Sequence, residues 1–228
     1  MLKRLSLVSL VLLVASGAFA APIKYNVLAK EKDGTMAKIG TLLQETSGDD
    51  ASGYVDESTL TLEQEGHKAT FHELTHYGKD GMDTSKTFDF TPPDGPEIKI
   101  KATLDDSGAK VTVWKGDDKD EKQIDLASKT PRADATNFWF KTVHPKEGDS
   151  VTYQSFSVED PEDLAWTDVT LKLVGKKTVK VGGKDVEANE IDRTEGEDKS
   201  TIYVDDKGDA VLVIQADGNL RFERDTSA

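Results

Sequence analysis

The stretch Gly66-His67-Lys68-Ala69-Thr70-Phe71-His72-Glu73-Leu74-Thr75-His76-Tyr77-Gly78 decides the fold. It contains the string H-E-x-x-H, which on a helix places two histidines one turn apart around a zinc ion, with the glutamate as general base. On a strand the two histidines are separated by ~13 Å of backbone, too far to share an ion with Zn–N bonds of about 2 Å. Only eleven residues lie between the two glycines, and the threonines and aromatics among them are poor helix formers. We predict a strand with His72, Leu74 and His76 on one face and Phe71, Glu73, Thr75 and Tyr77 on the other.

The third ligand of a zinc site is absent from the positions where metalloprotease patterns place it. In the longer pattern H-E-x-x-H-x-x-G-x-x-H, the glycine and the last histidine would fall at Lys79 and Met82. Glu97 lies near the distance of the third ligand in thermolysin-like enzymes, but it follows Pro96 and opens an alternating segment. We therefore predict no catalytic residue, no metal and no cofactor. The alternative is a zinc hydrolase in which His72 and His76 bind the metal with Glu97 or His144, and Glu73 acts as the general base.

Alternation of apolar and polar residues, broken by turn sequences, runs through most of the chain and predicts an all-β fold. Glycines at Gly34, Gly108, Gly182-Gly183 and Gly208 are typical of tight hairpins. We expect an antiparallel meander that forms a curved sheet or half-open barrel, in one domain over residues 21–228 with a possible sub-sheet boundary near 128–135. The expected strands cover residues 25–29, 36–44, 54–65, 69–77, 86–90, 97–104, 110–114, 123–126, 137–143, 150–158, 165–174, 177–181, 184–194, 200–205, 210–216 and 220–224.

The N-terminus has the features of a secretory signal peptide. Lys3 and Arg4 precede an apolar run, and Ala18-Phe19-Ala20 forms an A-x-A cleavage site. The run is shorter than the ~20 residues of a membrane span, and we expect no transmembrane segment. These features predict export to the periplasm or the extracellular space after removal of residues 1–20.

Charge and composition exclude several classes of function. Lys3 and Arg4 are the only charges in residues 1–20, so cleavage changes the net charge from −14 to −16, which repels nucleic acid and anionic lipid headgroups. The chain has no cysteine, which excludes disulfides and thiol chemistry. It also lacks the G-x-S-x-G elbow of many serine hydrolases, and its acidic turns do not follow the calcium-loop pattern.

Aromatic side chains concentrate in residues 138–166 and suggest a place for an apolar ligand. Curved sheets and barrels hold such ligands in a concave face lined by apolar residues. The alternative is a filled core without a cavity. The candidate ligand-binding residues are Phe138, Phe140, Tyr153, Phe156 and Trp166.

Four segments carry a resemblance to a known group: the strand with Gly34 and Gly40, the segment Asn137-Phe138-Trp139-Phe140, the hairpin of residues 177–183, and residues 202–208 followed by Val211. Their layout resembles exported bacterial β-rich proteins of unknown function, similar in outline to periplasmic lipoprotein carriers that hold acyl chains in a concave sheet. The resemblance implies a half-open or closed antiparallel barrel and assigns no catalytic residues.

Together these observations predict an exported, non-enzymatic module that binds an apolar small molecule or an envelope partner protein. Two alternatives remain open at this point. One is the zinc hydrolase, and the other is a purely structural envelope protein.

The export prediction has a direct test. Because Ala18 and Ala20 supply the small residues that signal peptidase requires, we expect the mature protein to begin at Ala21. N-terminal sequencing of protein from the native host measures this. Intact Met1 on the folded protein would contradict it.

Overall fold

The structure is a computed structural model that describes residues 22–49, 51–64, 66–126, 128, 130–132, 139–215 and 218–226. Its strands form one 14-stranded antiparallel sheet in the order β8-β7-β6-β5-β4-β3-β2-β1-β14-β13-β12-β11-β10-β9. The predicted signal peptide lies outside the described residues. Within them, no helix is long and apolar enough to cross a membrane.

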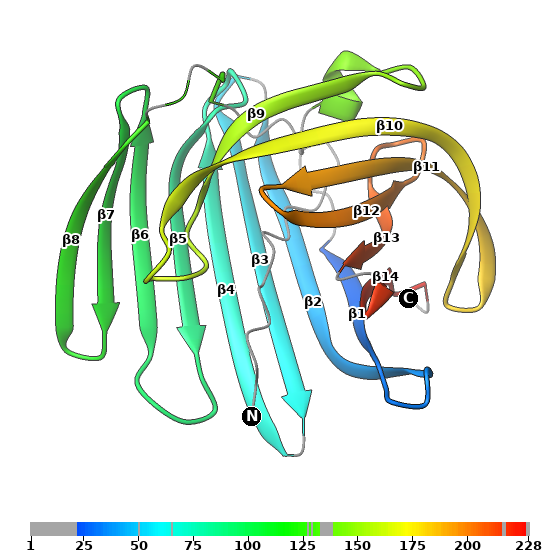
Figure 1. Ribbon diagram of the computed structural model, residues 1–228, viewed down its shortest axis with the longest axis horizontal. Helices are drawn as coiled ribbons and strands as arrows, with labels where there is room; N and C mark the ends of the chain where they lie inside the picture. The colour runs from blue at the N-terminus through cyan, green and yellow to red at the C-terminus, as the bar shows by residue number, and fades with distance from the viewer. Residues whose placement is uncertain are drawn as a thin grey trace.

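Two consecutive meanders build the sheet (Figure 1). They join where β1 pairs with β14, so β8 and β9 are the two end strands. The first meander contains β1 (Ile23–Lys30), β2 (Met36–Asp49), β3 (Gly53–Gln64), β4 (His67–Tyr77), β5 (Asp83–Thr91), β6 (Ile98–Asp105), β7 (Gly108–Lys115) and β8 (Asp118–Asp125). The second contains β9 (Ser150–Ser157), β10 (Ala165–Val181), β11 (Lys184–Glu195), β12 (Asp198–Val204), β13 (Ala210–Gln215) and β14 (Leu220–Arg224).

The all-β antiparallel meander predicted from the sequence is confirmed, and the H-E-x-x-H string lies on a strand, β4. Two expected strands, residues 165–174 and 177–181, are one long strand. This strand, β10, continues through an irregularity in its pairing near Gly175, which has a φ of 136°. A glycine at a bulge tolerates that conformation, so Gly175 bends the strand without ending it.

The prediction of a strand over residues 137–143 is wrong for the part of this segment that the structure describes. Residues Trp139–Val143 form a short π-helix, η1, in the connection between β8 and β9. Trp139 is buried in the main core cluster from this connection. Trp139 is therefore buried by packing onto the sheet from a connection and is not part of a strand.

The sheet overlaps itself like a roll. In Figure 1, β9 and β10 cross in front of the upper part of the first meander. Phe156, Val158 and Trp166 from this crossing pack against inner-face residues of β5, β6 and β7, among them Phe88, Ile100 and Val111. In the part of the chain that the structure describes, no backbone pairing joins β8 to β9. The roll is therefore closed by side-chain packing.

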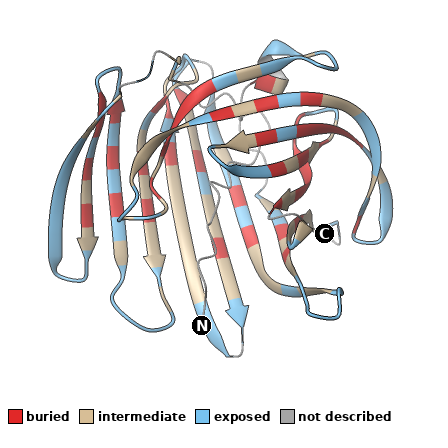
Figure 2. Ribbon diagram, viewed as in Figure 1, coloured by how far each residue is buried: buried red, intermediate tan, exposed pale blue. Residues whose placement is uncertain are grey.

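Burial along β9 reflects this overlap. Four consecutive residues, Tyr153 to Phe156, are buried, whereas a strand with one wet face buries every second residue (Figure 2). Tyr153 belongs to the main core cluster and Phe156 to the cluster formed with β5, β6 and β7. Because neighbouring side chains point to opposite faces, β9 is covered on both.

Gly40 permits a close approach between β2 and β3. It lies on β2 beside the irregularity in the pairing of β1 and β2, and its φ is not positive. A Cβ atom at this position would collide with the backbone carbonyl oxygen of Thr61 on β3. β2 and β3 would have to move apart to accommodate any residue larger than glycine at this position.

This contact predicts the effect of Gly40→Ala. We expect it to lower the free energy of unfolding by about 1–3 kcal/mol, the usual cost of overpacking, in urea denaturation. Gly34→Ala is the comparison for backbone strain without a clash: a Cβ there meets nothing within 4 Å, so its loss, roughly 1–2 kcal/mol, comes from the φ of 88° alone. A smaller loss for Gly40→Ala than for Gly34→Ala would contradict this account of the close approach.

Candidate functional site

Three neighbouring rows of inner-face side chains cross β2 to β5, each row set by the strand register. The aromatic row is Leu42, Leu60, Phe71 and Phe90; the glutamate row is Gln44, Ser58, Glu73 and Phe88; the lysine row is Thr46, Asp56, Thr75 and Lys86. Adjacent rows are two residues apart along each strand, or about 7 Å. The inner face thus changes from apolar to polar along the strand direction.

The aromatic row includes apolar side chains that remain partly exposed. Phe71 and Phe90 are half-buried, and their rings stack with centroids 4.5 Å apart and an interplanar angle of 11°. Phe71 contacts both the main core and the cluster shared with β9 and β10, so its ring points to the inside of the roll. The exposed part of this pair is therefore accessible apolar surface on a concave face.

The lysine row leads to a buried ionic network under the β9 crossing. Lys86 Nζ lies 3.6 Å from Asp83 Oδ2 and 3.5 Å from Ser155 Oγ, and the side chains of Lys86 and Asp83 are 2% and 0% exposed. Arg132 Nη1 donates to Asp83 Oδ1 at 3.0 Å and also to the Asp83 carbonyl oxygen. The backbone beside Arg132 is tied to β9, because Gln154 N donates to Pro131 O at 2.9 Å. This network fastens the β9 edge to β5.

Lys86 and Ser155 form a serine–lysine pair, an arrangement that some hydrolases use for nucleophilic catalysis. In this chain the Lys86 ammonium is engaged by the Asp83 carboxylate, and Ser155 is buried under the crossing. An ammonium held in an ion pair does not take up the proton of a serine hydroxyl. The pair is accordingly part of the fastening between β9 and β5.

Asp56 is also held by its neighbours. Thr46 Oγ1 donates to Asp56 Oδ1 at 2.8 Å, and Gln44 Nε2 donates to both carboxylate oxygens at 3.3 and 3.2 Å. Glu73 is half-buried, and the Thr75 hydroxyl donates to its Oε1 at 3.4 Å. It is the least buried of the three charged side chains in the glutamate and lysine rows.

A buried tyrosine, Tyr25, lies where the two meanders join. Tyr25 is fully buried, and its hydroxyl donates to the Ala210 carbonyl oxygen at 3.2 Å. Burial raises the pKa of the Tyr25 phenol well above its usual range, although the Arg224 guanidinium beside it acts in the opposite direction. Tyr25 is thus a neutral hydrogen-bond donor that ties β1 to β13.

The histidines of the H-E-x-x-H string lie on the outer face of β4, opposite to Glu73. His72 Nε2 is 2.8 Å from Glu57 Oε1, its Nδ1 is 3.6 Å from Asp89 Oδ2, and His76 is exposed. Glu97 and His144, the other proposed ligands, are exposed in loops. Among the described residues, no group of three or more His, Asp or Glu side chains could hold a metal ion. On this strand Glu73 cannot act on a metal bound by His72 and His76.

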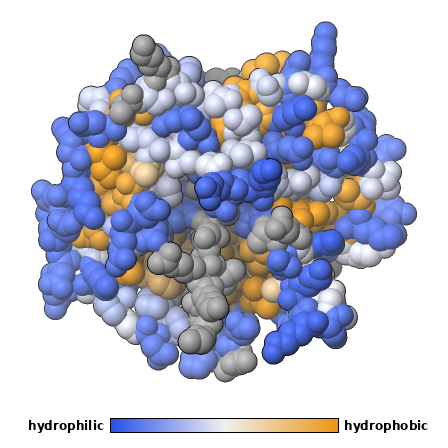
Figure 3. Space-filling view, in the orientation of Figure 1, coloured by the Kyte–Doolittle hydropathy of each residue, from blue (hydrophilic) through white to orange (hydrophobic). Residues whose placement is uncertain are grey.

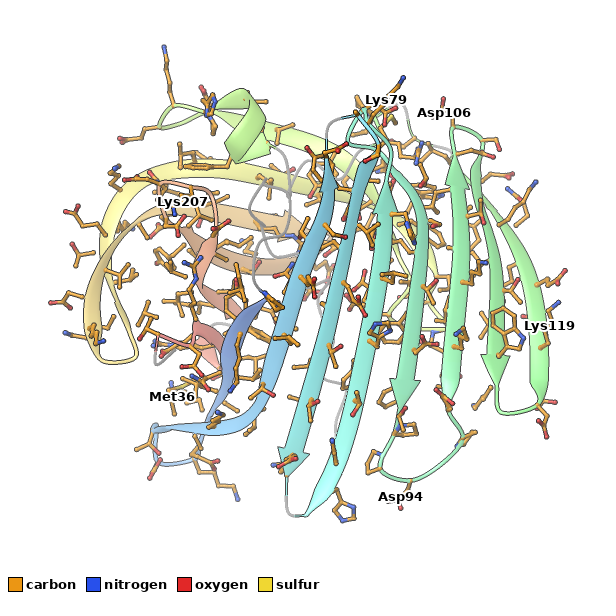
Figure 4. All side chains as sticks on the ribbon, turned by 180° about the vertical axis from the view of Figure 1, so that it is seen from behind. Met36, Lys79, Asp94, Asp106, Lys119 and Lys207 are labelled. Atoms are coloured by element: carbon orange, nitrogen blue, oxygen red, sulfur yellow. The ribbon has the colours of Figure 1, made fainter. Side chains whose placement is uncertain are left out.

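The outer face of the first meander, seen from behind in Figure 4, carries the ion pairs that link Glu57, His72, Asp89 and Lys99 across β3 to β6. In that view Lys79 and Asp106 mark the end of the sheet nearest the lysine row, and Asp94 marks the opposite end. In Figure 3, patches of apolar surface are visible on either side of the residues drawn in grey. Phe71, Phe88 and Phe90 pack with the inner clusters, so the inner side of this wall is its apolar side.

The aromatic residues proposed from the sequence as a ligand site fall into two groups. Phe140 and Tyr153 pack with the main core, whereas Phe156 and Trp166 pack with β5, β6 and β7, with ring centroids 5.1 Å apart. Tyr153 is 2% exposed and Phe156 is 1% exposed. Phe138 lies outside the described residues. The joint role of these residues in binding a ligand stays a prediction, and Tyr153 and Phe156 point to opposite faces of β9.

The sequence analysis placed Phe71, Glu73 and Thr75 on one face of a strand, but it did not select that face as a site. The feature of the sequence that could have identified this face is a pair of alternating phenylalanines, Phe88 and Phe90, on the next strand. Alternation within β4 and β5 limits the possible pairings, and the register then brings Phe71 opposite Phe90.

Comparison with solved structures supports the fold. The chain is similar to a crystal structure described as a beta-barrel-like protein of domain of unknown function DUF1849 from Brucella abortus, with a TM-score of 0.58 and 12% identity over 90% of this chain and 94% of that one. It also aligns with a DUF1089 family protein from Pseudomonas aeruginosa, with a TM-score of 0.42 and 13% identity over 75% of this chain and 87% of that one. A scan of protein-family models and a search of curated proteins found no match.

The first of these similarities, together with the sheet topology, defines the class: an all-β, barrel-like fold whose sheet, over the described residues, is not closed by backbone pairing. At this level of identity the similarity concerns the fold alone.

The ionic network under the crossing predicts a large effect of Arg132→Met. Removing the guanidinium leaves the Asp83 carboxylate buried with one cation instead of two. We expect a loss of about 3–5 kcal/mol in the free energy of unfolding, the usual result of breaking a buried ion pair. Lys99→Met, which removes a half-exposed pair with Asp89, is the control and should cost no more than about 1 kcal/mol. Equal losses in urea denaturation would show that the network does not fasten the roll.

Proposed function

We propose that this chain is an exported, non-enzymatic binding module that holds a small apolar molecule against its inner face, on the stacked pair Phe71 and Phe90. The observation that carries the proposal is the partial exposure of these two aromatic rings on the concave side of the sheet. Concave sites lined by apolar and aromatic side chains, with a few polar groups, are typical of small-molecule binding.

The position of the β9 crossing supports this location. β9 and β10 cross the inner face toward the end where the β4–β5 turn lies (Figure 1). Phe156 and Trp166 on these strands pack against β5, β6 and β7. The aromatic row lies further from that turn along the same strands. Apolar surface left in contact with water favours binding of an apolar molecule, by roughly 25 cal/mol for each Å² that becomes buried.

The predicted likeness to periplasmic lipoprotein carriers belongs to this proposal. A module of this kind would share with those carriers a concave sheet that shelters an apolar chain from water. Export would place it where such molecules must cross an aqueous space. An envelope partner protein remains the second occupant that the sequence suggested, and a zinc hydrolase is disfavoured by the opposite orientations of Glu73 and His72 on β4.

Replacement of Phe71 tests the proposal. We expect the purified protein to bind the fluorescent apolar probe N-phenyl-1-naphthylamine and Phe71→Ala to weaken that binding by about tenfold, because part of the stacked surface is lost. Fluorescence titration gives the dissociation constants, and circular dichroism checks that the variant is folded.

Leu43→Ala is the matched control, since Leu43 is 46% exposed and alternates with the buried Leu42, which places it on the outer face. Its binding should equal that of the unchanged protein. Absence of probe binding, or an equal loss in both variants, would overturn the inner-face site.

A further inference from the structure

We infer that the outer face of β6, β7 and β8 binds an uncharged sugar chain, one ring of which stacks on Trp114. This site lies on the opposite side of the sheet from the aromatic row, and it does not depend on the proposed function. It follows from one row of side chains that the strand register sets across β5 to β8. This tryptophan row is Asp89, Lys99, Trp114 and Lys119.

Trp114 differs from the other two tryptophans of the chain. Trp139 is buried in the main core cluster, and Trp166 packs on the inner side and donates its indole N–H to the Ile124 carbonyl oxygen at 3.4 Å. Trp114 is half-buried and belongs to none of the three core clusters. Its neighbour Val113 points inward, so Trp114 points to the outer face.

The indole of Trp114 is accessible to a ligand. Among the described residues it makes no hydrogen bond and no ring contact, and its nitrogen is not one of the buried polar atoms that lack a partner, so water reaches it. Because β7 is paired on both sides, the exposed surface of Trp114 comes mainly from the side chain. In Figure 4 no other strand passes over the outer side of β6, β7 and β8.

Hydrogen-bonding groups of both signs lie beside the ring. Lys99 and Lys119 are directly opposite Trp114 on its two neighbouring strands, at the ~5 Å separation typical of paired Cβ atoms. Their side chains are 49% and 51% exposed, and their ammonium groups pair with the carboxylates of Asp89 and Glu121. An ammonium has three donors and a carboxylate about four acceptor positions, so this pairing leaves hydrogen-bonding capacity on each group.

A sugar ring matches this arrangement. In β-linked chains of glucose or N-acetylglucosamine, each ring presents C–H groups on its two faces and hydroxyl groups around its rim. The C–H face can stack on the indole, while rim hydroxyls donate to the carboxylates and accept from the ammonium groups. The tryptophan row crosses three strand spacings, roughly 14 Å, which is longer than one sugar ring.

Charge selects an uncharged chain. The cations of the tryptophan row are balanced by carboxylates on the same face. The whole chain has a net charge of −14, which repels a polyanion. A sugar without carboxylate or sulfate groups avoids that repulsion and uses donors and acceptors equally.

Three hexasaccharides test the inference: cellohexaose, the β-linked hexamer of N-acetylglucosamine, and the hexamer of galacturonic acid. Saturation-transfer NMR titrations give the dissociation constants and identify the sugar protons that contact the protein. We expect the two uncharged hexamers to bind through their ring C–H protons, and the galacturonic acid hexamer to bind at least about tenfold more weakly. Saturating N-phenyl-1-naphthylamine should not displace the sugars, because it is directed to the opposite face.

Replacement of Trp114 locates the site. We expect Trp114→Ala to weaken binding of the uncharged hexamers at least about tenfold, whereas Trp114→Phe, which keeps an aromatic ring, should stay within about threefold of the unchanged protein. Leu43→Ala is the matched control, because it shortens a 46% exposed apolar side chain on the outer face of β2. Its binding of the hexamers should be unchanged.

Several outcomes would overturn the inference. Neither uncharged hexamer may fail to bind, and the galacturonic acid hexamer must not bind best. An equal loss in Trp114→Ala and Leu43→Ala would show that the sugar does not stack on Trp114. Should Trp114→Ala not fold, as judged by circular dichroism, the double variant Lys99→Met with Lys119→Met takes its place. Loss of both ammonium groups should weaken binding at least about tenfold, and unchanged binding would overturn the site.

Discussion

The structure depends on the packing of one end of the sheet into its other end. Phe156 and Trp166, from the crossing of β9 and β10, fill the inner face of β6 and β7 around Ile100 and Val111. A closed barrel obtains its closure from a backbone ladder between its end strands. Here burial of apolar area supplies it, and the ion pair of Arg132 with Asp83 adds a directional contact. A misplaced buried charge is costly, so such a pair can favour one position of the crossing over others.

This arrangement gives the two faces of β4 different roles. On the outer face, His72 lies between Glu57 and Asp89, and Lys99 contacts the same Asp89 in a polar network across four strands. On the inner face, Glu73 lies beside the aromatic row, where only part of the surface is covered. In the H-E-x-x-H string, neighbouring residues therefore alternate between the two faces of β4. Each residue suits the environment of the face on which it lies.

The similarity to the Brucella abortus protein at 12% identity shows that two very different sequences can adopt a similar barrel-like fold. What such sequences need to share is alternation, turn residues at the strand ends, and enough apolar side chains on one face to bury the crossing. A site built on individual side chains, such as Phe71 or Glu73, is not implied by the shared fold. Function has to be argued from the residues of this chain.

The sequence by itself determined the all-β class, the strand nature of β4 and nearly every turn, because period-two alternation and turn chemistry are local properties. It also determined which residues share a face. It did not predict the π-helix at Trp139–Val143, where apolar residues dock onto the sheet from a connection. Only the tertiary structure decided which faces are covered. Phe71 and Phe156 have similar local patterns, yet Phe156 is buried by strands far away in the sequence and Phe71 remains half-exposed. Coverage depends on how the sheet curls, and that curl is set by long-range packing that no local pattern encodes.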